Sequence, residues 1–121
     1  ACPEGYDPSP ALLEACGNHV TIERDPAVAV KQAHLLVTDV WASMGQKEET
    51  EQRKVRFKGF QVNDELMAAT GKKSLFMHCL PAHRGEEVSG DVIDGKQSVI
   101  WDEAENRLHA QKALLLYLIN G

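Results

Sequence analysis

Residues Ser74–Pro81, which read SLFMHCLP, decide the fold of this chain. The stretch is apolar up to His78 and Cys79, and its closing proline ends an extended run, so its first four residues are expected to form a short strand. A second stretch, His34–Thr38, reads HLLVT and is followed directly by the carboxylate of Asp39. Ligands bind at the carboxyl ends of strands in parallel α/β sheets. The two stretches therefore predict one crevice that is lined from two strand ends.

The composition is that of one globular domain, and it argues against two classes of partner. With 121 residues, of which 43% are hydrophobic and 26% charged, the chain is long enough for a single core. A net charge of −5 gives no reason to expect nucleic acid. The longest apolar run, Ala113–Ile119, is far shorter than the roughly 20 residues that cross a bilayer. Neither a nucleic acid nor a membrane is therefore expected as a partner.

The cysteines and the first residues bear on the cellular setting of the chain. Cys2, Cys16 and Cys79 are odd in number and stand in unrelated contexts, which argues against a disulfide framework and favours a reducing compartment. The chain opens with Ala1–Glu4 (ACPE) rather than with methionine or a signal peptide. That opening reads like the exit from an upstream strand, so we expect a domain that is truncated at its N-terminal side.

Short apolar runs alternate with helical patterns along the whole chain. This alternation predicts an α/β domain, a three-layer Rossmann-like fold with a mainly parallel sheet flanked by helices. Helix caps are visible at Ser9, Asp25 and Asn63. The polar stretch 46–58 predicts a solvated helix with little core contact. The expected helices span 9–16, 25–32, 46–58, 63–69 and 102–120, the expected strands span 19–22, 34–38, 74–77 and 98–101, and a loop with one helical turn fills 82–95. The strand at 34–38 is continuous in apolar residues and is expected to be buried on both faces.

The last helix carries two unusual features. Asp102 and Glu105 have the spacing of a capping box, which predicts that the helix begins there. Arg107 would then lie in the first turn, where the helix dipole disfavours a cation. Either an anionic ligand or a salt bridge to Glu103 or Asp102 would explain it. From Ala113 onward the helix is apolar all round, so we expect it to pack against protein outside this chain.

Cys79 permits several interpretations. A free cysteine is often a buried small hydrophobe, whereas a thiolate needs nearby cations, which His78 and Arg84 could supply. Zinc could be held by His78, Cys79 and His83, but a fourth ligand and a Cys-x-x-Cys pair are not evident, so no metal is expected. A Cys–His hydrolase is weaker still, because no stretch of sequence provides an oxyanion hole.

Asp39 and the residues after it suggest an amine-binding site. A carboxylate at a strand end suits a cationic amino group, although an N-cap or Asx-turn of the following loop is the favoured explanation of Asp39 taken alone. Ser43, Met44 and Gly45 follow it and offer a hydroxyl, backbone N–H groups and a flexible glycine. As an isolated tripeptide this signal is weak.

Four stretches together resemble one known family, the bacterial-type ornithine carbamoyltransferases, in their ornithine-binding domain. They occur in the family's order and cover nearly the whole chain. Proline stands in place of Cys79 in the sister aspartate enzymes, and the Ser-Met-Gly tripeptide points to ornithine rather than putrescine. The stretches are ACPEGY at 1–6, DVW with SMGQ between 39 and 46, HCLPAHRGEEV at 78–88 and EAENR at 103–107.

The resemblance implies an enzymatic role for particular residues. The implied reaction transfers a carbamoyl group from carbamoyl phosphate to the δ-amine of ornithine and yields citrulline and phosphate. The segment 43–58 resembles the loop that closes over ornithine. The implied roles are Cys79 and Asp39 in catalysis, with Cys79 as proton acceptor, Asp39, Ser43 and Met44 in ornithine binding, Cys79, Leu80 and Arg107 in carbamoyl-phosphate binding, and His78 as a neighbour of the site.

The resemblance also implies what the 121 residues lack. The carbamoyl-phosphate-binding domain, with its STRTR loop and HPxQ segment, is absent from the sequence, as is the GDGNN strand end. Residues 1–121 are therefore expected to be a partial ornithine-binding domain that is inactive alone. The implied parent is cytoplasmic, needs no cofactor, serves arginine biosynthesis or the urea cycle, and forms a homotrimer or a multiple of it.

One alternative from another class remains open. A non-catalytic Rossmann-like module that binds an amino acid or a nucleotide would share the expected fold. The chain has no Gly-x-Gly-x-x-Gly, which counts against a dinucleotide.

Overall fold

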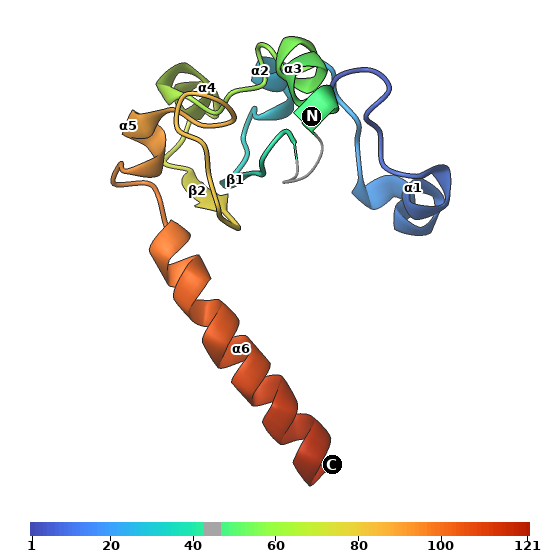
Figure 1. Ribbon diagram of the computed structural model, residues 1–121, viewed down its shortest axis with the longest axis vertical. Coiled ribbons are helices and arrows are strands. Elements are labelled where there is room, and N and C mark those ends of the chain that lie inside the picture. The colour runs from blue at the N-terminus through green and yellow to red at the C-terminus, as the bar shows by residue number, and fades with distance from the viewer. Residues whose placement is uncertain (43–46) are drawn as a thin grey trace.

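A two-stranded parallel sheet lies at the centre of the molecule (Figure 1). The computed structural model describes residues 1–42 and 47–121. Strand β1 spans Leu35–Thr38 and strand β2 spans Leu75–His78, and they pair in parallel so that Leu35 lies opposite Leu75 and Thr38 lies opposite His78. Both strands were predicted within a residue, and the parallel α/β arrangement is confirmed.

Helices connect and flank the strands. The first residues of three of them follow side-chain caps as predicted, because the Ser9, Asp25 and Asn63 side chains accept hydrogen bonds from backbone N–H groups of the turn that follows. The helices are α1 (Pro10–Cys16), α2 (Pro26–Ala29), α3 (Lys47–Arg56), α4 (Asp64–Ala69), α5 (Gly90–Ile93) and α6 (Ile100–Asn120), with a 3₁₀ turn, η1, at Gly17–His19. The second helix is thus shorter than predicted.

The core occupies one face of the sheet. Phe76, on β2, is 0% exposed, and Leu36, on β1, is buried beside it. Leu35 and Val37 alternate with Leu36 and are 42% and 62% exposed, so the prediction that β1 is buried on both faces is wrong. Successive side chains of a strand point to opposite faces, and in the described residues only one face is covered. The core consists of Val30, Leu36, Val62, Met67, Phe76, Val88, Val92, Ile93 and Ile100.

Two predicted strands are not formed. His19 is the last residue of η1, and residues 20–22 follow it as irregular chain with Val20 exposed, because no described strand lies beside them. At 98–101 the pairing is limited to one bridge between Ser98 and Phe76, since α6 already begins at Ile100. The side chain of Ile100 is 1% exposed and belongs to the core.

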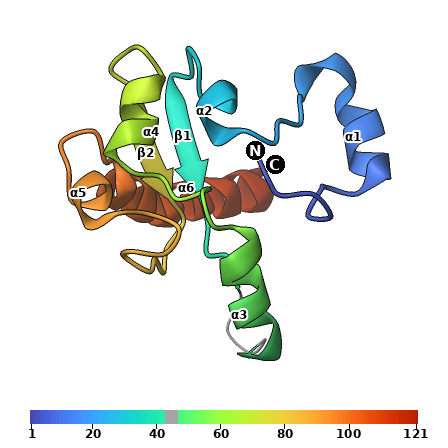
Figure 2. The ribbon, with the colours of Figure 1, turned by 90° about the horizontal axis from the view of Figure 1, so that it is seen from above.

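Helix α6 begins two residues earlier than predicted, whereas its end at Asn120 agrees with the prediction. Its N-cap is Val99, without a side-chain hydrogen bond, so the capping box of Asp102 and Glu105 is not formed. Arg107 consequently lies about two turns inside the helix rather than in its first turn. Figures 1 and 2 show α6 leaving the rest of the molecule beyond β2, and its residues from 104 to 120 are exposed.

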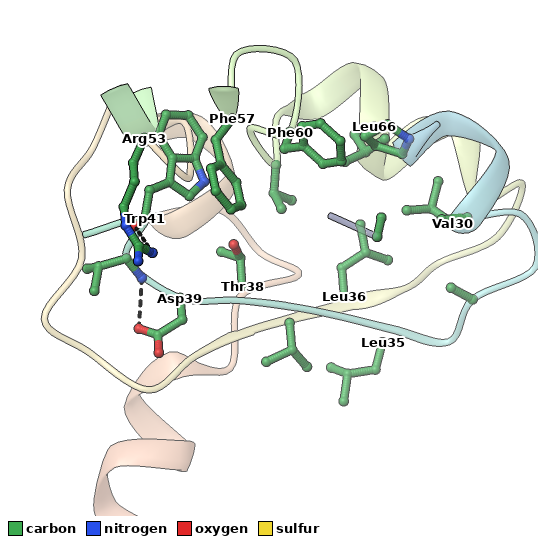
Figure 3. A pocket seen from close by; sticks show the side chains of 17 residues that line it. Val30, Leu35, Leu36, Thr38, Asp39, Trp41, Arg53, Phe57, Phe60 and Leu66 are labelled. Atoms are coloured by element: carbon green, nitrogen blue, oxygen red, sulfur yellow. Dashed lines mark hydrogen bonds between the residues drawn. The ribbon is translucent and has the colours of Figure 1, made fainter. Parts of the chain in front are cut away.

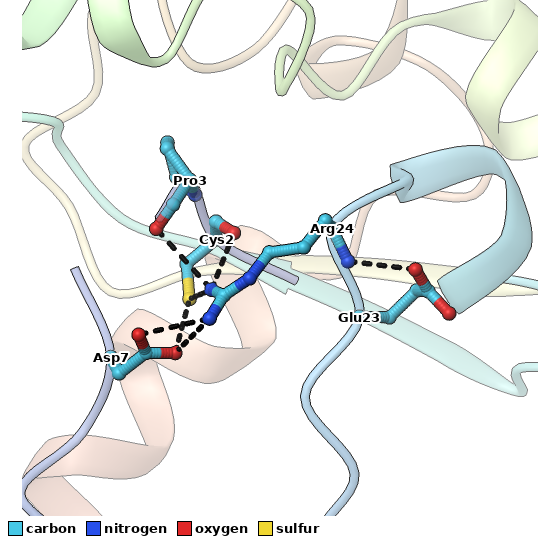
Figure 4. Close-up of polar contacts among 5 residues, drawn as sticks. All are labelled: Cys2, Pro3, Asp7, Glu23 and Arg24. Atoms are coloured by element: carbon cyan, nitrogen blue, oxygen red, sulfur yellow. Dashed lines mark hydrogen bonds and ion pairs between the residues drawn. The ribbon is translucent and has the colours of Figure 1, made fainter. Parts of the chain in front are cut away.

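The N-terminal segment is fastened by one arginine (Figure 4). The Arg24 guanidinium donates to the backbone oxygen of Cys2 at 3.0 Å and to both carboxylate oxygens of Asp7 at 2.7 and 2.9 Å. The three cysteines are free. Among the described residues, none of the helices combines the length and apolar character that crossing a membrane requires.

Candidate functional site

Asp39 and Cys79 are brought together by the register of the sheet. Each is the first residue after its strand, and the strands end on the paired residues Thr38 and His78. A carboxylate oxygen of Asp39, the Sγ of Cys79 and a ring nitrogen of His78 lie within 4.8 Å of one another. By strand alternation, Asp39 and Cys79 occupy the face of the sheet that Leu35 also occupies, which the described helices leave open.

The Cys79 side chain is a thiol in a locally acidic environment. Burial raises the pKa of Cys79, and its hydrogen bond to Asp39 and the negative charges of Asp39 and Glu103 raise the pKa further. The free site thus favours the protonated sulfur, which argues against an activated thiolate nucleophile. Two carboxylates beside an uncharged thiol are instead suited to receive a cationic amine.

His78 has no free ring nitrogen. Its Nδ1 accepts the backbone N–H of Leu80 at 2.9 Å, and its Nε2 lies 3.2 Å from Oε1 of the buried Glu87. The ring is therefore available neither as a zinc ligand nor as a general base for Cys79. His83 lies in a different group, with Glu86 and Glu87, so the three residues considered for zinc do not gather at one point.

Arg84 does not supply the cation that was considered for Cys79. Its guanidinium pairs with the carboxylate of Asp94, with Nε at 2.9 Å and Nη2 at 2.7 Å from the two oxygens. The cation that the sequence offered on the basis of proximity thus serves a surface ion pair. Together with the raised pKa of Cys79, this removes the thiolate interpretation for the free chain.

Helix α6 contributes to the site from its first turn only. The Glu103 carboxylate accepts the backbone N–H of His78, the β2 residue of the last pair of the sheet, at 3.0 Å. Arg107, one turn further along, is exposed, and within the described part of the chain no hydrogen bond or ion pair holds its side chain. The dipole argument for an anion at Arg107 is therefore wrong, and its assignment to carbamoyl phosphate depends on the family resemblance alone.

A pocket of about 450 Å³ lies along β1, and Asp39 is among the residues that line it (Figure 3). Figure 3 shows Phe57 and Phe60 on one side of the strand, whereas the Asp39 carboxylate points to the opposite side. Trp41 stacks on Phe57 with ring centroids 5.8 Å apart, and Arg53 donates to the Trp41 backbone oxygen at 3.2 Å. These contacts hold the C-terminal part of the predicted lid segment, so this part is less detached than its polar sequence suggested.

Leu80, Ser43 and Met44 are the remaining predicted site residues. Leu80 adjoins the cluster, is half-buried and has a left-handed backbone with φ of 57°. Ser43 and Met44 lie outside the described residues. Sequence reasoning missed Glu87 and Glu103, which contact His78 from a loop and from α6. Their spacing from His78 follows no local rule, so only the fold reveals these contacts.

A family model described as "Aspartate/ornithine carbamoyltransferase, Asp/Orn binding domain" matches residues 1–118. The chain belongs to this family. The aspartate/ornithine carbamoyltransferase domain explains the parallel sheet and the strand-end cluster as parts of one inherited fold, and the α/β Rossmann-like class is confirmed.

Relatives of this carbamoyltransferase domain agree in sequence and in structure. The chain is 60% identical over 121 residues to the ornithine carbamoyltransferase of Methylococcus capsulatus, covering 100% of this chain and 41% of that protein. It is 60% identical over 119 residues to that of Pseudomonas syringae, covering 98% of this chain and 39% of that protein. The solved ornithine carbamoyltransferase of Pyrococcus furiosus matches with a TM-score of 0.81 and 52% identity, over 93% of this chain and 38% of that one. The chain thus spans about two fifths of the length of the curated relatives it matches.

Proposed function

We propose that this chain is the ornithine-binding part of an ornithine carbamoyltransferase. The observation that carries the proposal is the pairing of the Asp39 carboxylate with the Cys79 sulfur at adjacent ends of parallel strands. Family membership and relatives named ornithine carbamoyltransferase support it. Nothing in the described residues favours the alternative of a non-catalytic binding module.

The proposed roles follow the charges in the cluster. Asp39 binds the cationic end of ornithine, together with Ser43 and Met44. Cys79 accepts a proton near the reacting δ-amine, because the arrival of an ammonium group next to the sulfur favours the thiolate that the free site disfavours. Arg107 and Leu80 contact carbamoyl phosphate from this side.

The proposed reaction is a simple group transfer. The neutral δ-nitrogen attacks the carbonyl carbon of carbamoyl phosphate and forms the new C–N bond. The C–O bond to phosphate breaks, and phosphate leaves with the electron pair while the nitrogen gives up a proton. Because an ammonium cannot attack, the δ-ammonium first loses one proton, and a positioned group that takes the second proton as the C–N bond forms accelerates the step. The cations that stabilise the developing negative charge come from the carbamoyl-phosphate-binding domain.

The proposal extends to the setting of the parent enzyme. Relatives from two Pseudomonas species carry the word anabolic in their names, which supports a role in arginine biosynthesis rather than breakdown. A cytoplasmic homotrimer, or a multiple of it, completes the proposal.

A chimeric enzyme tests this function. The Methylococcus capsulatus protein, with its matching segment replaced by this chain, is expected to form citrulline from ornithine and carbamoyl phosphate, whereas the 121 residues alone show no turnover. Asp39→Asn and Cys79→Ala should each lower kcat/KM for ornithine by about 10² or more. Asp64→Asn, an exposed carboxylate on α4, is the matched control and should leave the rate unchanged.

Two results would contradict the proposal. One is a folded chimera without citrulline production, with folding checked by circular dichroism. The other is full activity of both Asp39→Asn and Cys79→Ala, since the cluster would then not take part in the reaction.

A further inference from the structure

Besides the strand-end cluster, three side chains gather in the loop between β2 and α5. His83, Glu86 and Glu87 each offer one ligand atom, and these atoms lie within 4.8 Å of one another. An imidazole nitrogen together with two carboxylate oxygens is a ligand set that divalent transition ions accept. Acidic groups at a surface often gather without an ion, so this set is not sufficient by itself. One of its oxygen atoms, however, is buried.

That oxygen belongs to Glu87, whose side chain is 0% exposed. The other carboxylate oxygen, Oε1, accepts the backbone N–H of His83 at 2.6 Å and lies 3.2 Å from the ring nitrogen Nε2 of His78. Oε2 is also buried, and it makes no hydrogen bond within the described part of the chain. A buried carboxylate oxygen is costly without a donor or a cation beside it. Glu87 Oε2 therefore calls for a partner.

The unpartnered oxygen lies next to the ring of His83. Glu87 Oε2 is 3.9 Å from His83 Nδ1, which is too long for a hydrogen bond. Zinc binds imidazole nitrogen and carboxylate oxygen at about 2.0–2.2 Å, so two ligands of a tetrahedral ion are about 3.4 Å apart. The His83 side chain is 53% exposed, so a small rotation of its ring closes the difference. The gap between the two atoms thus suits a cation that both of them contact.

The backbone of the loop already holds the three side chains near one another. The Glu86 N–H donates to the His83 carbonyl at 3.0 Å, and Gly85 between them has the positive φ of 89° that this turn requires. The Glu87 carbonyl accepts the N–H of Val62 at 2.9 Å. A loop that is fixed in this way loses little conformational freedom when an ion binds.

Lys54 is the cation that contacts this cluster in the structure. Its Nζ reaches across from α3 and lies 3.0 Å from Oε1 of Glu86. This ion pair leaves the buried oxygen of Glu87 without a partner. Arg84, in the same loop, pairs with Asp94 instead. An incoming ion therefore competes with Lys54 for Glu86.

We propose that His83, Glu86 and Glu87 bind one divalent transition ion, for which Zn²⁺ is the probe. His83 Nδ1 and Glu87 Oε2 contact the ion, Glu86 reaches it after releasing Lys54, and water fills the remaining position. This set differs from the zinc ligands considered from the sequence, because it contains neither the sulfur of Cys79 nor the ring of His78. The inference does not depend on the proposed function.

Calorimetric titration of the 121-residue chain with Zn²⁺ tests the site. The titrated reference chain carries Cys2→Ala, Cys16→Ala and Cys79→Ala, because free thiols are themselves zinc ligands. We expect one Zn²⁺ per chain. Mg²⁺ should bind at least about 10²-fold more weakly, because it prefers oxygen ligands and the site offers an imidazole. Circular dichroism verifies that each variant is folded.

Single substitutions in the reference chain distinguish the ligands from their surroundings. His83→Ala and Glu86→Gln should each weaken zinc binding by about 10². His109→Ala is the matched control, because His109 is similarly exposed and lies 3.5 Å from Glu105, which is not buried. It should leave zinc binding unchanged. Lys54→Met removes the competing ammonium and should tighten zinc binding about two- to fivefold, the value of an exposed ion pair.

A spectroscopic measurement locates the ion in the chain with its natural cysteines. In a sample labelled with ¹⁵N-histidine, the paramagnetic ion Co²⁺ should broaden the ring signals of His83, which are assigned by comparison with His83→Ala. The broadening should be lost in Glu86→Gln. The ring signals of His109 should stay sharp in both samples.

The outcomes decide the proposal in either direction. It is supported when zinc binding is lost in His83→Ala and Glu86→Gln and retained in His109→Ala. A folded reference chain that binds no zinc overturns it, as do ligand variants that bind zinc as tightly as the reference chain. Sharp His83 signals in the presence of Co²⁺ also overturn it, and this result does not depend on the cysteine substitutions.

Discussion

Two regions of the molecule differ in how far their side chains are buried. They are the α/β part around β2 and the long helix α6. In the first region, Phe76 is fully buried and the polar groups of His78 are paired with Glu87, Glu103 and Leu80. In α6 after the first turn, every side chain is exposed. Figure 1 shows this helix without a neighbour along most of its length. The α/β region is stabilised by tertiary contacts, whereas α6 depends on its own backbone hydrogen bonds, which alone give marginal stability.

The difference teaches that apolar content and burial are separate properties in this chain. The side chains of residues 114–119 are between 52% and 77% exposed, although they form its most apolar run. As far as the structure describes the chain, Ile100 is the one buried residue of α6 and Glu103 the one half-buried residue. The helix begins at the buried Ile100, Glu103 accepts the backbone N–H of His78, and the residues after Glu103 are exposed.

The largest effect is expected from truncating one side chain in each region. Phe76→Ala should lower the free energy of unfolding by about 3–5 kcal/mol, because it removes a large buried ring and leaves a cavity. Leu115→Ala in α6 should change it by no more than about 0.5 kcal/mol, since that side chain is exposed in the chain alone. Urea denaturation of the 121-residue chain measures both. Equal losses of unfolding free energy in the two variants would show that α6 and the α/β region contribute alike to stability.

A moderate effect is expected at Cys79, where the two regions meet. Burial and Asp39 raise its pKa, with a smaller contribution from Glu103 of α6. The midpoint of its alkylation rate against pH should therefore lie above the roughly 8.5 of an ordinary thiol. Asp39→Asn should move the midpoint down, Glu103→Gln should move it down less, and Glu105→Gln, further along α6, should not move it.

Peptide mapping by mass spectrometry separates Cys79 from the two other cysteines in that experiment. A midpoint below that of a free thiol would mean that a cation, rather than Asp39, controls the sulfur. The acidic description of the site would then be wrong.

The smallest effect is expected from exposed ion pairs. The Arg84 hydrogen bonds lower the pKa of Asp94 in the folded chain. A lowered folded pKa contributes stability above the ordinary value of about 3.9, and this stability is lost as the pH falls through the folded value. Asp94→Asn and Arg84→Gln should therefore flatten the acid limb of unfolding free energy against pH to the same extent.

In α6 the corresponding test is the pair of Glu105 and His109, whose nearest atoms are 3.5 Å apart. Glu105→Gln should leave the unfolding free energy of the α/β region unchanged at neutral pH, because both side chains are exposed. A measurable loss of unfolding free energy in Glu105→Gln would show that α6 contributes to the stability of the α/β region. The two regions would then not be energetically separate.

The features that the sequence predicts correctly are local ones. Ser9, Asp25 and Asn63 cap helices because the acceptor and the N–H groups it serves are only two or three residues apart. The nearness of Asp39 and Cys79 follows from two apolar runs and the rule that parallel strands end at one edge. The strand predicted at 98–101 is wrong, because Ser98 forms a single bridge to Phe76 and α6 already begins at Ile100.

The candidate site was also predicted only in part. The residues of the HCLP stretch are visible in the sequence, but the partners that orient them are not. Arg84 looked like a cation for Cys79 and pairs with Asp94 instead. Glu87 looked like one more charged loop residue and is the buried acceptor for His78 and His83. Long-range pairing of polar groups is decided by the fold, so single-residue reasoning could not assign it.

The parallel pairing of β1 and β2 has a consequence for how this domain can diversify. The pairing of β1 with β2 sets the register that places Asp39 next to Cys79. The long crossover connection between the two strands runs through α3 and α4. Insertions or exchanges within that crossover leave the strand ends in place. The crossover can therefore vary in length and sequence among members of a family named for two substrates, while the two strand ends keep their relative position.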